Sequence, residues 1–269
     1  MYWLNGLNTS HRLCQGLEMW HCAMPGMAFG RSSPDLTGRN RNAVSESNVS
    51  HWVSTYTPPG VSYGRAIYNS SGTRMVVSKS GNLRPASCTL IASTKLNTNA
   101  NQMTLSNRSF PGFTGLVLYF TNSTLVLIGS TTGSDWELLN TTGRSLGTEW
   151  HRCAVTYDAE TGIGQTYVDG VPDISSTITP APLAWASNDW SVYSEPGVRM
   201  VGYQHDSKVY SRALSAAEIR EEYIESLTGN RRLFSPSSVA RLSDVASGQP
   251  SIKRLGGVPF AHSLGRGVW

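Results

Sequence analysis

The sequence has few charged residues, no long apolar run and no closely paired cysteines. Asp, Glu, Lys and Arg make up 15% of its 269 residues, fewer than a disordered chain would carry. No stretch approaches the roughly 20 apolar residues that span a bilayer, so we expect no membrane partner. The segment Met1–His11 lacks a basic start followed by an apolar run, so we expect no secretory signal peptide.

Cysteine usage points away from a structural metal. The four cysteines, Cys14, Cys22, Cys88 and Cys153, include no CxxC pair. Structural zinc sites usually need such closely spaced ligands. We therefore expect reduced cysteines that serve as small core residues, as in a protein assembled in the cytoplasm.

Short stretches rich in β-branched and aromatic residues recur through the middle of the chain and indicate an all-β domain. The clearest is a hairpin. Trp150–Tyr157 alternates between polar and apolar residues, Asp158–Gly162 forms a turn, and Gly164–Val168 runs back to an Asp169-Gly170 turn. Strands spaced by roughly ten residues predict a sandwich or barrel.

One helix is expected near the C-terminus. Ser215 and Glu218 form a capping box before an apolar pattern that ends at Gly229. The helix would turn Glu221, Glu222 and Glu225 toward water.

The hairpin and helix motifs together resemble laminin-G-like, or concanavalin A-like, modules. The segments that carry the resemblance are Trp150–Asp158, Tyr167–Gly170 and Lys208–Ile219, preceded in the family's order by Gly16–Trp20, Asp35–Gly38, Trp52 and Gly64–Ile67. The resemblance covers about residues 13–228. It implies a two-sheet antiparallel β-sandwich, or jelly roll, with one short C-terminal helix. We expect an N-terminal extension in residues 1–12, the sandwich in 13–229 and an extended basic arm in 230–269.

A narrower resemblance is to the laminin-G-like virion proteins of tailed bacteriophages. It rests on the Leu13-x-x-Gly-Leu17 start, the Asp35–Asn40 segment and the basic tail that begins at Arg231. It implies a non-enzymatic virion structural protein, in the first place a capsid decoration (cement) protein on the virion surface. Such a protein is assembled in the host cytoplasm as a homo-oligomer or as lattice-bound copies. Its partners would be the major capsid protein or a tail component.

The tail from Arg231 onward carries six cations and one anion, a net charge of +5, which leaves −1 for the rest of a chain whose total is +4. Without interleaved aromatics or a nucleic-acid motif, this charge favours a protein partner over nucleic acid. Two groups of tail residues are candidates for docking. Salt bridges would come from Arg231, Arg232, Lys253 and Arg254, and apolar anchors from Leu233, Phe234, Phe260 and Trp269.

The alternative is a carbohydrate-binding module for host surface glycans, because sugars are held by aromatic platforms with polar groups on loops. The candidate platforms are Trp52, Tyr56, Trp185, Trp190, Tyr193 and Tyr203, although most of them fit a place in the sandwich core or at its edge better. We expect that no cofactor is required. Ca²⁺ would be held by Asp35, Asp169 and Asp206, which match acidic positions of the family, although the Asp-Gly turn alone explains Asp169.

A polysaccharide hydrolase is the third alternative. Glycanases of this fold place carboxylates at alternate positions of a strand. Asp135 and Glu137 approach that pattern but lack its third carboxylate. HExxH, GxSxG and GK[S/T] patterns are also absent, so we expect no enzymatic activity.

Overall fold

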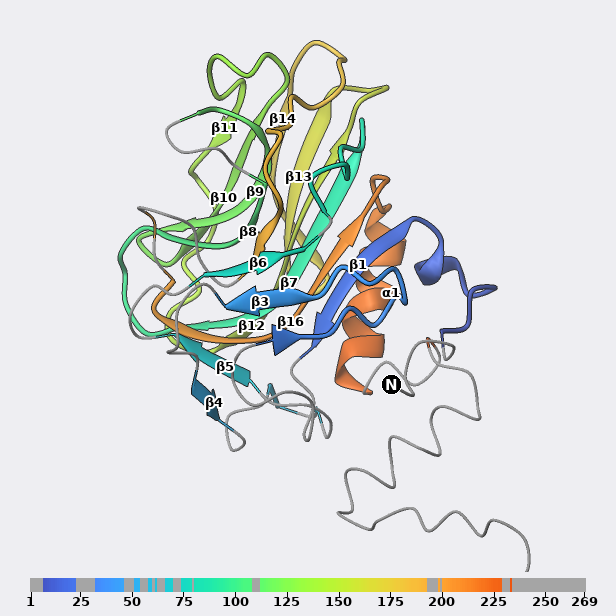
Figure 1. Ribbon diagram of the computed structural model, residues 1–269. Helices are drawn as coiled ribbons and strands as arrows, with labels where there is room; N and C mark the ends of the chain where they lie inside the picture. The colour runs from blue at the N-terminus through green and yellow to red at the C-terminus, as the bar shows by residue number, and fades with distance from the viewer. Residues whose placement is uncertain are drawn as a thin grey trace, which may run out of the picture.

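The computed structural model describes residues 7–22, 32–45, 51–53, 58–59, 61, 66–69, 74–78, 80–107, 112–192, 198, 200–228 and 233. In these residues the chain forms two antiparallel sheets packed face to face, with one α-helix against the outside of one sheet (Figure 1). A short 3₁₀ turn, η1 (Arg12–Cys14), precedes the first strand. The predicted all-β sandwich with one short helix is confirmed. No helix among the described residues has the length and apolarity needed to cross a membrane.

The first sheet has eight strands and carries the helix. In spatial order they are β14 (Val171–Thr177), β13 (Ile163–Val168), β12 (Trp150–Asp158), β7 (Cys88–Leu96), β16 (Gly202–Tyr210), β5 (Ala66–Asn69) and β4 (His51–Val53), while β1 (Leu17–Cys22) also pairs with β16.

The second sheet also has eight strands. Its order is β11 (Leu138–Asn140), β10 (Thr124–Ser130), β9 (Gly115–Thr121), β8 (Gln102–Ser106), β15 (Ser191–Val192), β6 (Met75–Val77), β3 (Ala43–Ser45) and β2 (Ser32–Ser33).

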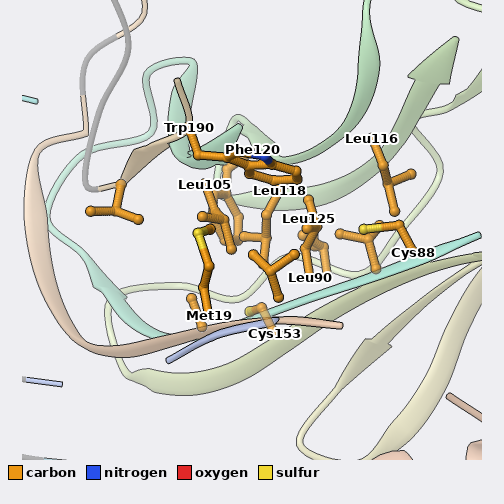
Figure 2. Packing of buried hydrophobic residues seen from close by; sticks show 14 of the residues in the cluster. Met19, Cys88, Leu90, Leu105, Leu116, Leu118, Phe120, Leu125, Cys153 and Trp190 are labelled. Carbon is orange, nitrogen blue, oxygen red and sulfur yellow. The ribbon is translucent and has the colours of Figure 1, made fainter. Parts of the chain in front are cut away.

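The main core fills the space between the two sheets. Alternate residues of each strand point inward, so apolar side chains from both sheets meet there (Figure 2). Cys88 and Cys153 are among them and are not disulfide-bonded, as expected. Burial raises the pKa of the Cys153 thiol to about 12, so this cysteine is an inert core residue.

The predicted hairpin between β12 and β13 is present, and the following turn, which joins β13 to β14, packs against the helix. Asp169 and Gly170 both have positive φ, 54° and 75°, as a tight two-residue turn requires. A Cβ on Gly170 would lie 3.0 Å from the Cβ of Tyr223, so glycine lets the turn approach the helix closely.

Helix α1 (Ala216–Leu227) begins at the predicted capping box. The Ser215 side chain accepts a hydrogen bond from the Glu218 N–H, and the Glu218 side chain accepts one from the Ser215 N–H. The helix lies beside β1 and β16 (Figure 1), where Ile219 joins a second apolar cluster with Trp20 and Ile91. The expectation that Glu222 and Glu225 face water is wrong, because both are about 1% exposed.

Glu222 is buried because it belongs to a compact network of charges between α1 and the sheet. Its carboxylate accepts hydrogen bonds from Arg152 Nε at 3.0 Å and from Lys208 Nζ at 2.8 Å. Arg152 also pairs with Asp206 and donates to the hydroxyl of Ser93 at 2.7 Å. Two cations and two anions therefore balance one another beneath the helix.

The acids of this network are held in their charged forms. Burial alone would raise their pKa values, but the positive charges of Arg152 and Lys208 outweigh it, and His205 adds a hydrogen bond to Asp206. The pKa of Asp206 is held far below its usual range, and that of Glu222 is lowered. Arg152 thereby joins the hairpin, the central strand β16 and the helix.

We predict that Glu222→Gln lowers the free energy of unfolding by about 3–5 kcal/mol, because it leaves a buried cation without a counter-charge. Urea unfolding followed by circular dichroism measures the change. Glu221→Gln is the matched control: Glu221 pairs with Arg12, whose side chain is 55% exposed, so its loss should change stability by less than about 1 kcal/mol. Equal effects of the two substitutions would contradict a structural role for the network.

Candidate functional site

The outer face of the first sheet carries a row of large side chains that crosses four neighbouring strands. Trp150 of β12 lies opposite Lys95 of β7, Lys95 lies opposite Tyr203 of β16, and Tyr203 lies opposite Tyr68 of β5. Directly opposed residues of antiparallel strands point to the same face. We call Trp150, Lys95, Tyr203 and Tyr68 the aromatic row. All four side chains are half-buried.

Strand alternation decides which face the row occupies. Cys153 and Val155 of β12 point into the core between the sheets, while Ala154 points to the helix side. Trp150 shares the parity of Ala154 and Arg152. The row therefore lies on the outer face that α1 covers elsewhere.

The three rings of the row form a continuous aromatic surface. The ring centroids of Tyr68 and Tyr203 are 4.7 Å apart, with the planes tilted by 36°. The centroids of Trp150 and Tyr203 are 6.3 Å apart, with a tilt of 48°. These separations are typical of aromatic pairs that stabilise each other's position.

A small pocket lies next to the row, between the start of β12 and the C-terminal end of α1. Its volume is about 130 Å³, enough for one six-membered ring. It is lined by Pro58, Pro59, Val61, Ser93, Trp150, His151, Arg152, Asp169, Tyr223, Ser226 and Leu227. Trp150 belongs to both the pocket and the row, so the two form one site.

His151 and Asp169 supply an ion pair at this pocket. The Asp169 carboxylate lies 2.7 Å from His151 Nδ1 and accepts a hydrogen bond from the Arg152 N–H at 2.9 Å. His151 Nε2 lies 2.9 Å from the Leu146 carbonyl oxygen. Both imidazole nitrogens thus face acceptors, which favours the doubly protonated ring.

The pKa values of the pair move in opposite directions. The hydrogen bond with Asp169 raises the pKa of His151 above its ordinary value, against the opposing effect of burial. Burial would raise the pKa of Asp169, but the bonds with His151 and the Arg152 N–H lower it.

We predict that Asp169→Asn lowers the pKa of His151, measured by NMR titration of its ring protons. A raised folded-state pKa stabilises the fold fully below the unfolded value of about 6.5, and this contribution is lost as pH rises through the folded value. The free energy of unfolding of the wild-type protein should therefore fall as pH rises from about 6.5 through the folded-state pKa of His151. The fall should be smaller in Asp169→Asn. Asp173→Asn, four residues further along on β14, is the control. An unchanged His151 titration in Asp169→Asn would show that the pair is not coupled.

The structure separates the aromatic residues predicted from sequence. Tyr203 lies in the aromatic row. Trp190 is fully buried and donates from its indole N–H to the Leu83 carbonyl, so it is a core residue and offers no ring face to a ligand. Trp185 is half-buried against Trp190, with ring centroids 5.0 Å apart, and donates to the Pro85 carbonyl. Tyr56, Tyr193 and the side chain of Trp52 lie outside the described residues.

The three aspartates proposed for Ca²⁺ do not form one site. Asp35 accepts hydrogen bonds from the backbone N–H groups of Trp20, Thr37 and Arg41, Asp206 pairs with Arg152, and Asp169 pairs with His151. Within the residues that the structure describes, no three His, Cys, Asp or Glu side chains group as metal ligands do. Each carboxylate instead organises the chain around it.

The predicted docking arm is described at one residue. Leu233 is fully buried in the same cluster as Leu13, and its carbonyl accepts a hydrogen bond from the Asn8 N–H at 2.8 Å. Leu233 is therefore an anchor on the protein's own sandwich and is not exposed for a partner. The other arm candidates, Arg231, Arg232, Phe234, Lys253, Arg254, Phe260 and Trp269, lie outside the described residues.

Sequence reasoning missed Trp150, Lys95 and Tyr68 as site residues. The sequence places Trp150 in the hairpin motif. Its spacing of two residues from Arg152 indicates that both side chains lie on the same face of the strand, which is the local signal for a partly exposed tryptophan. The alignment with Lys95 and Tyr68 depends on strand register and has no local signal.

With this geometry in place, comparisons with known proteins define the class. A family model described as the concanavalin A-like lectin/glucanases superfamily, in its laminin-G-like form, matches residues 69–220. The match spans more than half of the chain, so the protein belongs to this superfamily. No curated protein matches the sequence.

Solved structures share the fold at low sequence identity. The botulinum neurotoxin serotype D binding domain superposes with a TM-score of 0.56 at 13% identity, covering 78% of this chain and 50% of that one. A structure from botulinum neurotoxin type C, whose cell entry depends on interaction with two ganglioside molecules, gives 0.57 at 12%, covering 78% and 51%. The chain thus spans about half the length of these structures.

A third structure is matched over nearly its whole length. Domain 4 of AbnA, a GH43 extracellular arabinanase from Geobacillus stearothermophilus, was solved in complex with arabinotriose. It superposes with a TM-score of 0.56 at 15% identity, covering 76% of this chain and 97% of that one. At these identities the likeness establishes the fold alone.

Proposed function

We propose that the protein is a non-enzymatic carbohydrate-binding module that holds glycans along the aromatic row. The observation that carries the proposal is the alignment of three half-buried rings across neighbouring strands, next to a pocket of about 130 Å³. A pyranose ring has an apolar C–H face, which packs against aromatic rings, and hydroxyl groups, which need polar partners. The row supplies the first and the pocket the second.

Each part of the site has a role in this proposal. Tyr203 and Tyr68 would support successive sugar rings along the row. Trp150 would hold the ring at the entrance of the pocket. Asp169, oriented by its hydrogen bonds with His151 and the Arg152 N–H, would accept a hydrogen bond from a sugar hydroxyl.

Two further facts support the proposal. The arabinanase domain with the same fold was solved with a bound oligosaccharide. Desolvation would raise the pKa of Glu137, the carboxylate candidate for hydrolysis, but hydrogen bonds from the Thr132 side chain and the Thr131 N–H lower it below its ordinary value. A general acid needs a raised pKa to be protonated at neutral pH. Polysaccharide turnover that is lost in Glu137→Gln would contradict the non-enzymatic proposal.

The test is a glycan array followed by calorimetry on the best ligand. We expect Trp150→Ala and Tyr203→Ala to weaken binding about tenfold each, since each removes one stacking surface. Trp136→Ala is the control, because Trp136 packs against Phe113 in the cluster on the outer face of the second sheet. Thermal unfolding checks that all three variants fold. Binding that survives Trp150→Ala but is lost in Trp136→Ala would place the binding site on the second sheet and contradict the proposal.

A second proposal concerns where the module is displayed. The proposal rests on the resemblance of the Leu13–Leu17 and Asp35–Asn40 segments to laminin-G-like phage proteins and on the net charge of +5 from Arg231 onward. In this proposal it decorates a capsid, or belongs to a tail, in several copies on the virion surface after assembly in the host cytoplasm. The basic segment binds another virion protein. Decoration and glycan binding are compatible, because they use different parts of the chain.

We predict that a chain ending at Phe234 keeps the fold but no longer binds particles. The truncation retains Leu233, which is buried against the sandwich, so the unfolding midpoint should stay within a few degrees of wild type. Sedimentation with purified virions, followed by electron cryo-microscopy, measures the association. If the truncated chain still decorates particles, the basic segment is not the docking element.

A further inference from the structure

We propose that the aromatic row selects anionic glycans, with Lys95 as the residue that recognises the acidic group. This inference rests on the proposed carbohydrate-binding function and specifies its ligand: a sugar that carries a carboxylate. The observation behind it is the position of a lysine within the row itself, opposite Trp150 on one side and Tyr203 on the other.

The Lys95 ammonium has unused hydrogen-bonding capacity. It donates to the Thr148 carbonyl at 2.6 Å, and an ammonium group has three donors. Within the described part of the chain it forms no ion pair with a carboxylate. Other cations on this sheet face differ, because Arg152 and Lys208 are both paired with Glu222.

The location of Lys95 makes this charge matter for a bound sugar. Its Cβ lies about 5 Å from those of Trp150 and Tyr203, as direct cross-strand neighbours do. The lysine side chain therefore starts between these two aromatic residues, and its flexible stem would let the ammonium reach the substituents of a sugar packed on either of them. Without a ligand, the ammonium lies on the Thr148 carbonyl, two residues before Trp150.

Desolvation turns this position into selectivity. A neutral sugar that covers the ammonium removes water from a charge without replacing it, which is unfavourable. A carboxylate replaces the water with charge-assisted hydrogen bonds, which are shorter and stronger than neutral ones. The same aromatic surface should therefore hold acidic sugars more tightly than neutral sugars of the same shape.

The carboxylate that lines the pocket does not cancel this preference. Asp169 lies in the turn after β13, and β13 and β7 flank β12 on opposite sides. Trp150 of β12 thus stands between Asp169 and Lys95. Asp169 is also engaged by His151 and by the Arg152 N–H. The row carries the cation Lys95, and the acidic group Asp169 lies in the pocket.

The test uses two pairs of ligands that differ in charge, measured by calorimetry with the full-length protein. One pair is an oligogalacturonate and its methyl ester, and the other is 3′-sialyllactose and lactose. We expect at least one charged ligand to bind about tenfold or more tightly than its neutral partner, as a charge-assisted hydrogen bond implies. The preference should shrink as the NaCl concentration rises. The responding pair shows whether the acidic group is a uronate or a sialate.

Variants assign the preference to Lys95. Lys95→Gln should abolish the difference between charged and neutral ligands, and Lys95→Arg should keep it. Arg84→Gln is the matched control for net charge. Arg84 is an exposed cation that precedes the start of β7 at Cys88, whereas Lys95 lies near the end of that strand. A preference that persists in Lys95→Gln would overturn the role of Lys95.

The outcomes separate this inference from the proposed function. Equal binding of charged and neutral ligands, still lost in Trp150→Ala, would overturn the selectivity and leave carbohydrate binding in place. Failure of every ligand on the array and in calorimetry would overturn both.

Discussion

The guanidinium group of Arg152 joins three parts of the chain that are distant in sequence. It pairs with Asp206 on β16 and with Glu222 on α1, while its own strand β12 belongs to the hairpin. Lys208 completes the charge balance and also lies 4.2 Å from the ring centroid of Trp20. These charges are almost fully buried, so the helix can pack on the sheet in only one position that keeps all of them paired.

The candidate site follows from that arrangement. Strand alternation puts Trp150 on the same face as Arg152, at the edge of the area that α1 covers. The Asp169-Gly170 turn packs against Tyr223 of the helix and presents its carboxylate to the same pocket. Register with β7, β16 and β5 then extends the surface from Trp150 through Lys95 to Tyr203 and Tyr68. A structural network and a binding surface thus share one sheet face.

The parts of the structure that sequence predicted correctly are those with local signals. The Asp169-Gly170 turn and the capping box at Ser215 depend on neighbouring residues and were identified. Glu222 was misassigned to the solvent face because its partners, Arg152 and Lys208, come from other strands. Trp190 was proposed as a sugar platform because its loop-like surroundings gave no sign of full burial. Of the aromatic row only Tyr203 was predicted, because Trp150, Lys95 and Tyr68 join it from other strands through long-range pairing.

The central claim is that ligands bind on the helix-bearing face of the sandwich. The indole N–H signals of the eight tryptophans, observed by NMR during titration with the best glycan, test it most directly. The account predicts that the Trp150 signal shifts with the ligand concentration, whereas those of buried Trp190 and of Trp136 on the other sheet do not. A shift of Trp136 with no change at Trp150 would contradict it.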